Sequence, residues 1–150
     1  MDKKEATILF DALVDQIKVA SWFTEDWFVY RDGNYIHVAK HGWHDEKHQG
    51  IHFEVYVGDA EIGAKEFPIM LHAEADVPQR EQFVNRMRTA IQFQIPSFMR
   101  EADDYTIFKE MHPLDKEIFV AEVLQALEEL QFIVPFVDMC LEENTELDIG

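Results

Sequence analysis

The sequence predicts an α+β fold, with an antiparallel meander of about four to five strands and amphipathic helices packed on one face. Apolar residues recur at helical spacing near both ends of the 150-residue chain, and period-two runs lie between them. Short turn-forming sequences join these runs, which favours antiparallel neighbours. We therefore expect a single domain over residues 1–150, with residues 142–150 forming a frayed acidic tail.

The first helix is predicted near residues 3–20. Asp2 and Glu5 have the spacing of a capping pair, in which each residue bonds the backbone of the other. The apolar positions that follow recur every three or four residues, at Ala6, Leu9, Phe10, Leu13, Val14 and Ile17. This pattern indicates an amphipathic helix.

Three runs predict the first strands. Residues 27–31 and 34–39 flank Asp32-Gly33, a strong hairpin signal because a tight turn needs positive φ. After a polar loop, apolar and polar residues alternate over residues 51–57, which is typical of a half-buried strand.

A turn region follows, marked by Gly58-Asp59 and Gly63, and a further strand is expected after Pro68, over residues 69–75. These two segments complete the predicted four-strand meander.

The second half of the chain predicts mainly helices. One helix is expected to start at Asp76 and Pro78 and to end at Pro96, and a final strand is expected over residues 105–111. Another amphipathic helix starts near Asp115, and Pro135 must kink or restart it because proline lacks the N–H that a helix needs.

The charge of the chain excludes one broad class of function. The 30 acidic residues outnumber 13 Lys and Arg, for a net charge of −17, and residues 101–150 alone carry 14 acids and two bases. Such a chain is repelled by phosphate, so general nucleic-acid binding is not expected. The acidic region is either a solvated helical face or a docking surface for a basic protein.

The expected location is the cytoplasm. The chain has one cysteine, Cys140, which fits a reducing compartment, and neither a secretory signal nor a membrane-spanning run is visible. We expect Cys140 to be an unreactive core residue, because it lies in an apolar helical stretch.

Paired histidines and glutamates predict a candidate metal site. His52 and Glu54 are two residues apart in one strand, and His72 and Glu74 repeat this spacing in the next. Each pair therefore shares a face, and strand pairing would bring the two pairs together. Two imidazoles and two carboxylates suit a divalent ion such as zinc, or acid–base chemistry. The alternative is plain alternation on a solvated face.

A second candidate metal site lies in the loop between two strands. His41, His44 and His48 occur there near Asp45 and Glu46, and a loop of this kind can close around zinc. The alternative is a polar loop that is rich in histidine.

Nucleophilic catalysis has no support in the sequence. Neither Ser21 nor Ser97 lies in a nucleophile-elbow motif, and the six glycines form no phosphate-binding pattern. We therefore predict no catalytic residue.

Several large aromatic residues are either core residues or anchors for a protein partner, and the sequence leaves both interpretations open. They are Trp22, Phe23, Trp27 and Trp43.

Two functional hypotheses follow. The first is an acidic cytoplasmic protein-interaction module without catalytic activity, similar to a chaperone, an immunity or inhibitor protein, or a DNA mimic. In size, acidity and element order the chain resembles the small dimeric chaperones of type III secretion, although four strands before the second long helix depart from that layout. The resemblance implies a protein partner and leaves a homodimer open. The second hypothesis is a divalent-metal-binding protein or metal-dependent enzyme that uses the paired His-x-Glu motifs.

Overall fold

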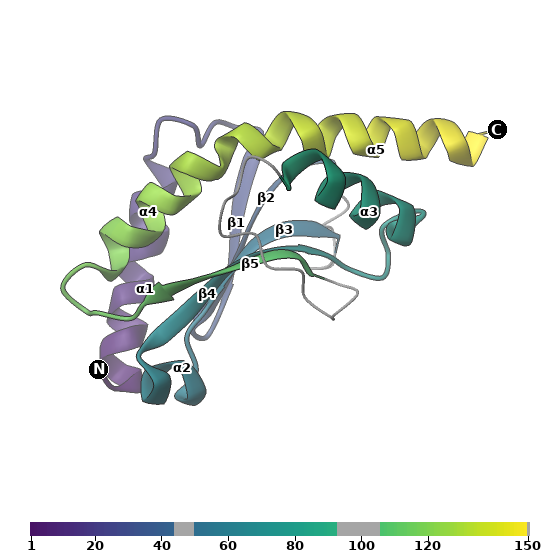
Figure 1. Cartoon of the computed structure of the whole chain (residues 1–150). Helices are drawn as coiled ribbons and strands as arrows, with labels where there is room; N and C mark the ends of the chain where they lie inside the picture. Colours follow the sequence, from purple (N-terminus) through teal and green to yellow (C-terminus); the bar gives the residue numbers. More distant parts are fainter. Residues whose placement is uncertain (44–49, 93–105, 150) are drawn as a thin grey trace.

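A five-stranded antiparallel meander forms the centre of the molecule, which confirms the predicted fold class (Figure 1). The computed structural model describes residues 1–43, 50–92 and 106–149, with side chains described as far as residue 143. Each strand pairs with the one before it in the chain. The strands are β1 (Trp27–Asp32), β2 (Tyr35–Lys40), β3 (Ile51–Tyr56), β4 (Glu66–Ala73) and β5 (Thr106–Pro113).

Helices cover one face of this sheet. They are α1 (Lys3–Lys18), α3 (Arg80–Ile91), α4 (Phe119–Glu129) and α5 (Val134–Ile149), with a short α2 (Asp59–Ala64) beside β4. Figure 1 shows α4 and α5 as one long, bent ridge, with α1 against α4 and α3 against α5. Within the described residues, each helix is too short or too polar to cross a membrane.

The predicted first helix is confirmed, including its cap. The backbone N–H of Glu5 donates to the Asp2 carboxylate at 2.8 Å, and the Glu5 carboxylate accepts from the Asp2 N–H at 3.2 Å. The buried stripe of α1 contains Phe10 and Leu13, and the Phe10 ring lies 5.4 Å from that of Phe119 on α4. The cap therefore fixes the start of a helix whose position depends on apolar packing.

The predicted hairpin is also confirmed. Gly33 has a φ of 58°, the left-handed conformation that glycine adopts at little cost, and it follows the last residue of β1. This turn pairs Tyr30 with His37 across the two strands.

Two features between β3 and β5 differ from the prediction. The Gly58-to-Gly63 region forms α2 rather than a turn, and Lys65 ends it with a φ of 59°. The strand β4 also begins before Pro68. Its pairing with β3 runs from Ile69 to Ala73, so Pro68 pairs only with β5 and its missing N–H interrupts no ladder to β3.

The remaining elements follow the prediction with shifted boundaries. The helix expected from Asp76 begins instead at Arg80, because Asp76 accepts a hydrogen bond from the Gly50 N–H at 2.8 Å. Its expected end at Pro96 lies outside the described residues. A 3-10 turn, Leu130–Ile133, separates α4 from α5 just before Pro135, as the predicted restart requires. The helix α5 then includes most of residues 142–150, where we expected a frayed tail.

The core lies between the sheet and the helices. Phe67 on β4 packs edge-on against Phe119 on α4, with ring centroids 5.0 Å apart. At the other end, the indole N–H of buried Trp43 donates to Asp138 on α5 at 2.9 Å, and Lys40 donates to the same carboxylate. Apolar packing therefore holds the helices on one face of the sheet, and polar side chains collect on the opposite face.

Candidate metal site

The alternation in β3 and β4 places the two predicted His-x-Glu pairs on the face of the sheet opposite the helices. Phe53 and Val55 are fully buried on the helix side, so His52 and Glu54 point the other way. The β3–β4 register sets His52 directly opposite His72. Glu74 follows the end of β4 and lies on the same face as His72.

The four predicted side chains form a ring of donor atoms. The Nε2 atom of His52 lies 3.8 Å from Oε1 of Glu54 and 3.7 Å from Oε1 of Glu74. The Nδ1 atom of His72 lies 3.8 Å from Oε2 of Glu54 and 3.5 Å from Oε1 of Glu74. Each imidazole therefore approaches both carboxylates, and Glu54 uses a different oxygen for each histidine.

A fifth residue, His37, joins this group and was not among the predicted ligands. It lies opposite Glu54 in the β2–β3 register, and its Nε2 is 2.9 Å from the Glu54 carboxylate. Its ring also stacks on that of His52, with centroids 3.6 Å apart and planes 9° apart. His37 thus contacts two members of the ring from its outer side.

The donor atoms lie in a sheltered position. The side chain of His52 is 0% exposed and that of His72 is 13% exposed, whereas Glu54 and Glu74 keep 17% and 28%. The histidine nitrogens are thus the buried part of the group, and the carboxylates form its more accessible side.

Electrostatics in the group favour ionised carboxylates. Burial by itself raises the pKa of Glu54, but the hydrogen bond with His37 and the nearby histidines outweigh it and lower that pKa below its usual value. The pKa of Glu74 is lowered too, chiefly by its hydrogen bond with His72 and against the opposing effect of burial. Both carboxylates are therefore prepared to act as anionic ligands.

Two overlapping sets in this group have the donor spacing of a metal site. His37, His52 and Glu54 form one, His52, His72 and Glu74 form the other, and in each set the ligand atoms lie within 4.8 Å of one another. The two sets share His52, and neither set contains all four predicted ligands.

The alternative loop site cannot be assembled from the described residues. His44 and His48 lie outside them. His41 is exposed, and its ring lies 5.0 Å from that of Phe28.

The predicted aromatic anchors divide into two groups. Trp27 and Trp43 are buried, at 7% and 1% exposure, and their rings are 5.5 Å apart. This burial removes them from the candidate partner contacts, because the same packing that orders the core excludes a partner. Trp22 and Phe23 are half-buried beside them and retain some accessible surface.

A separate histidine contact lies between β5 and α4. Nε2 of His112 is 2.7 Å from Glu110, and its Nδ1 is 2.9 Å from Glu122. Burial opposes protonation here, but the two carboxylates dominate and raise the pKa of His112. Both ring nitrogens of His112 already contact carboxylates. We therefore interpret this contact as a structural link between β5 and α4 rather than as a metal site.

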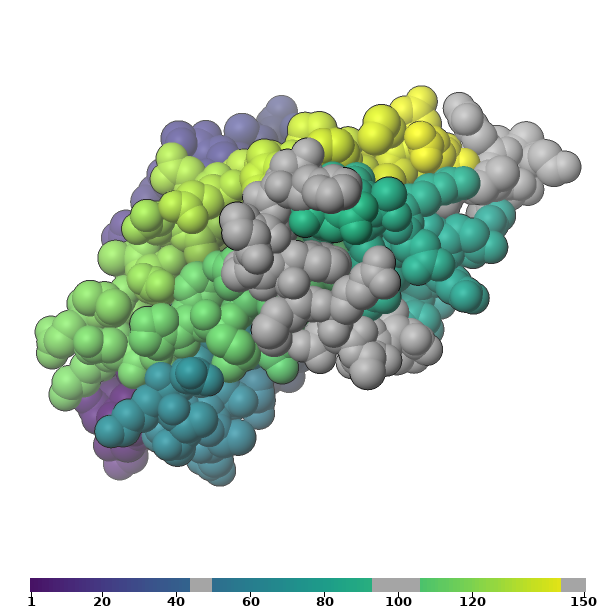
Figure 2. Space-filling view, viewed as in Figure 1, coloured from purple at the N-terminus to yellow at the C-terminus, as the bar shows by residue number. Residues whose placement is uncertain are grey.

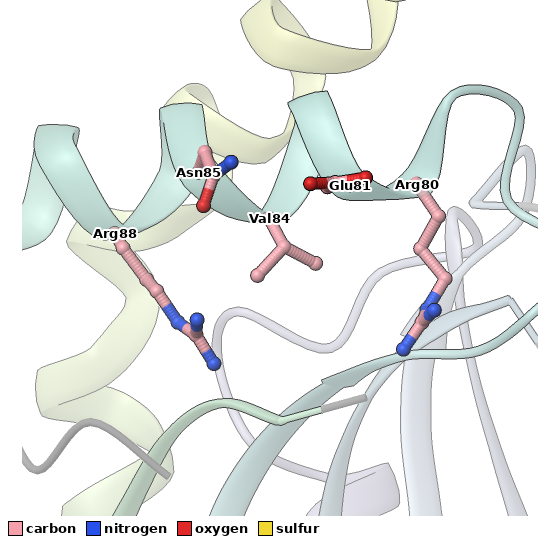
Figure 3. Close-up of a pocket in the computed structure, with 5 residues that line it drawn as sticks. All are labelled: Arg80, Glu81, Val84, Asn85 and Arg88. Carbon is pink, nitrogen blue, oxygen red and sulfur yellow. The ribbon is translucent and has the colours of Figure 1, made fainter. Parts of the chain in front are cut away.

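A pocket of about 260 Å³ lies along α3, between Arg80 and Arg88 (Figure 3). Both side chains extend from the helix toward the sheet. Nε of Arg80 donates to the Ala73 carbonyl at 2.7 Å, and Nη2 of Arg88 donates to the Thr106 carbonyl at 2.5 Å. These bonds attach α3 to β4 and β5, so the two guanidinium groups have a structural use.

Cys140 is buried at 3% exposure, and burial raises the pKa of its thiol, as expected for a core residue.

Comparison with known proteins adds no functional assignment, because no family model, no curated protein and no solved structure matches this chain.

Proposed function

We propose that this protein binds a divalent transition-metal ion, such as zinc, through His52, Glu54, His72 and Glu74. The ring of donor atoms on β3 and β4 carries this proposal, since its successive imidazole–carboxylate separations are 3.5–3.8 Å. Metal–ligand distances of about 2.0–2.1 Å place the ligands of a tetrahedral zinc ion about 3.3 Å apart. The four imidazole–carboxylate separations are thus close to this value, and Glu54 reaches the two imidazoles through different carboxylate oxygens.

The donor set argues for the class of ion. Two imidazole nitrogens with two carboxylate oxygens suit zinc and neighbouring first-row metals, whereas Mg²⁺ and Ca²⁺ favour sites made of oxygen alone. The net charge of two carboxylates and two neutral imidazoles also balances one divalent cation, which removes the cost of a buried uncompensated charge.

In this proposal His37 is a positioning residue. Its Nε2 is already bonded to Glu54 and its ring is stacked on His52, so it orients two ligands without needing to bind the ion. The burial of the histidine nitrogens favours a structural ion that ties β3 to β4 over a catalytic ion with an open position. We also propose that the protein is located in the reducing cytoplasm, which its single cysteine fits.

The competing interpretation is a metal-free network of His–Glu contacts. It predicts no measurable metal affinity, and metal titration separates the two. Protein treated with chelator is titrated with Zn²⁺ by calorimetry and with Co²⁺ by visible absorption, where tetrahedral coordination gives strong bands. We expect one ion per chain. If neither Zn²⁺ nor Co²⁺ binds, the proposal is overturned.

Variants locate the ion. His72→Gln and Glu74→Gln alter ligands that are not fully buried, so the fold is expected to survive, which circular dichroism checks. Each should weaken Zn²⁺ binding strongly and change the Co²⁺ spectrum. His41→Ala is the matched control, because His41 is exposed and belongs to the alternative loop site. Loss of binding in His41→Ala with no change in the other two would move the site to the loop.

A further inference from the structure

The helices α4 and α5 form an outer ridge with a net negative charge, and Lys40 pairs with one of its acids, Asp138. From Glu117 to the end of the chain there are nine acidic residues and no Lys, Arg or His. The ridge lies on the molecular surface along the top of Figure 2, in light green and yellow. Glu128, Glu129 and Glu142 are exposed, and none of them makes an ion pair within the described part of the chain. Glu143 is also exposed, but it pairs with Arg86 of α3 at 3.7 Å.

Apolar residues occupy the middle of the same exposed face. Phe132 is 38% exposed and Met139 is 47% exposed, and exposed Pro135 lies between them. Phe132 lies in the 3-10 turn, and Pro135 and Met139 lie near the start of α5. Together with the flanking acids they form the outer ridge patch, made of Glu128, Glu129, Phe132, Pro135, Met139, Glu142 and Glu143.

This arrangement differs from an ordinary solvated helix. A face that serves only solubility is polar along its whole length, whereas here two large apolar side chains are exposed between two pairs of glutamates. Exposed apolar residues rimmed by charge are typical of protein interfaces, in which the apolar centre supplies affinity and the rim selects the partner by charge.

We infer that the outer ridge patch docks a basic amphipathic segment of a protein partner, with apolar residues seated on Phe132 and Met139 and with Lys or Arg beside the glutamates. The charge decides between occupants. A second copy of this chain would bring two negative ridges together, and both nucleic acid and the anionic surface of a membrane would be repelled. The inference is independent of the metal site, which lies on the opposite face of the sheet.

The experiment uses a defined probe, a fluorescently labelled synthetic peptide of Lys and Leu that is patterned to form an amphipathic helix. A peptide with the same composition in scrambled order is the comparison. Binding is measured by fluorescence anisotropy at low and high salt. We expect the patterned peptide to bind more tightly, and both affinities to fall as salt rises. Equal binding by the two peptides would overturn the inference, because charge alone would then explain it.

Two sets of variants place the peptide on the ridge. Phe132→Ser with Met139→Ser should weaken patterned-peptide binding by roughly thirtyfold, the effect of losing an interface hot spot. The matched control is Ile8→Ser on α1 with Val19→Ser at the C-cap of that helix, and both side chains are more exposed than those of the ridge. The control should bind as wild type does. Similar losses in both double variants would overturn the inference.

The charge variants follow the same design. Four substitutions remove the ridge acids, namely Glu128→Gln, Glu129→Gln, Glu142→Gln and Glu143→Gln. The control removes an equal charge from exposed acids elsewhere, by Asp15→Asn, Glu25→Gln, Glu66→Gln and Glu81→Gln. The ridge set should lose most of the salt-dependent binding and the control set much less. Equal losses of salt-dependent binding in the two sets would show that the peptide responds to total charge. That result would contradict docking on a defined surface.

Discussion

The imidazole rings of His37 and His52 are stacked almost in parallel, with centroids 3.6 Å apart. They come from neighbouring strands, and the Nε2 of His37 is 2.9 Å from the Glu54 carboxylate. One side chain therefore limits the orientation of two candidate ligands at once. Because ordering a long side chain costs conformational entropy, ligands that are held in advance bind an ion more tightly.

Replacing His37 with Phe should separate positioning from ligation. The phenyl ring can still stack on His52, but it accepts or donates no hydrogen bond to Glu54. We expect Zn²⁺ affinity to fall by roughly 10–100-fold, the usual effect of losing a residue that supports a metal ligand. Calorimetric titration measures the change. Full retention of the Co²⁺ absorption spectrum would show that the ligand set is intact.

A result outside this range has a clear meaning. If His37→Phe loses the tetrahedral Co²⁺ bands and loses as much Zn²⁺ affinity as Glu74→Gln does, His37 is itself a ligand. Unchanged affinity would show that Glu54 needs no support from β2.

A bound ion should also stabilise the fold, since it would connect β3 to β4 and bind only the folded arrangement. Free Zn²⁺ at a hundred times its dissociation constant adds about 2.7 kcal/mol to the free energy of unfolding. Thermal denaturation with and without Zn²⁺ measures this effect. Glu74→Gln should lose most of the increase at the same Zn²⁺ concentration. An equal increase in wild type and variant would argue for binding outside the ring.

The sequence predicted the composition of this ring because period-two alternation assigns faces within a strand. Phe53 and Val55 require the helix side, which leaves His52 and Glu54 on the other. His37 was missed for a physical reason. Its own hairpin fixes its pairing with Tyr30, but its pairing with Glu54 depends on how β2 meets β3. The sequence of residues 41–50 carries no register signal for that pairing.

The same limit explains the misplaced element boundaries. The glycines at positions 58 and 63 predicted a turn, yet this segment forms the short helix α2. Lys65 ends that helix in the left-handed conformation. Likewise, Asp76 has the residue type of a helix cap but bonds the Gly50 N–H from another part of the chain. Tertiary contacts thus override local preference at the ends of elements, where few local bonds compete.

Leu13 and Leu124 offer a matched test of the helix packing. Leu13 on α1 is fully buried, whereas Leu124 on α4 is only partly buried. Leu13→Ala should therefore lower the free energy of unfolding by about 2–5 kcal/mol, because it removes buried methyl groups and leaves a cavity. The same change at Leu124 should cost less. Urea denaturation measures both, and a larger loss at Leu124 would contradict the observed packing.

His112 gives the stability of the fold a predictable dependence on pH. Burial favours its neutral form, but Glu110 and Glu122 outweigh burial and raise its pKa above the ordinary 6.5. Folding therefore favours the protonated ring, so this contribution is fully present below pH 6.5 and is lost as pH rises through the higher pKa of the folded state. His112→Gln keeps polar groups at the position but does not titrate. The difference in unfolding free energy between wild type and His112→Gln, measured in urea across this range, should shrink as pH rises. A difference that stays constant or grows would show that His112 is not held as a cation between the two carboxylates.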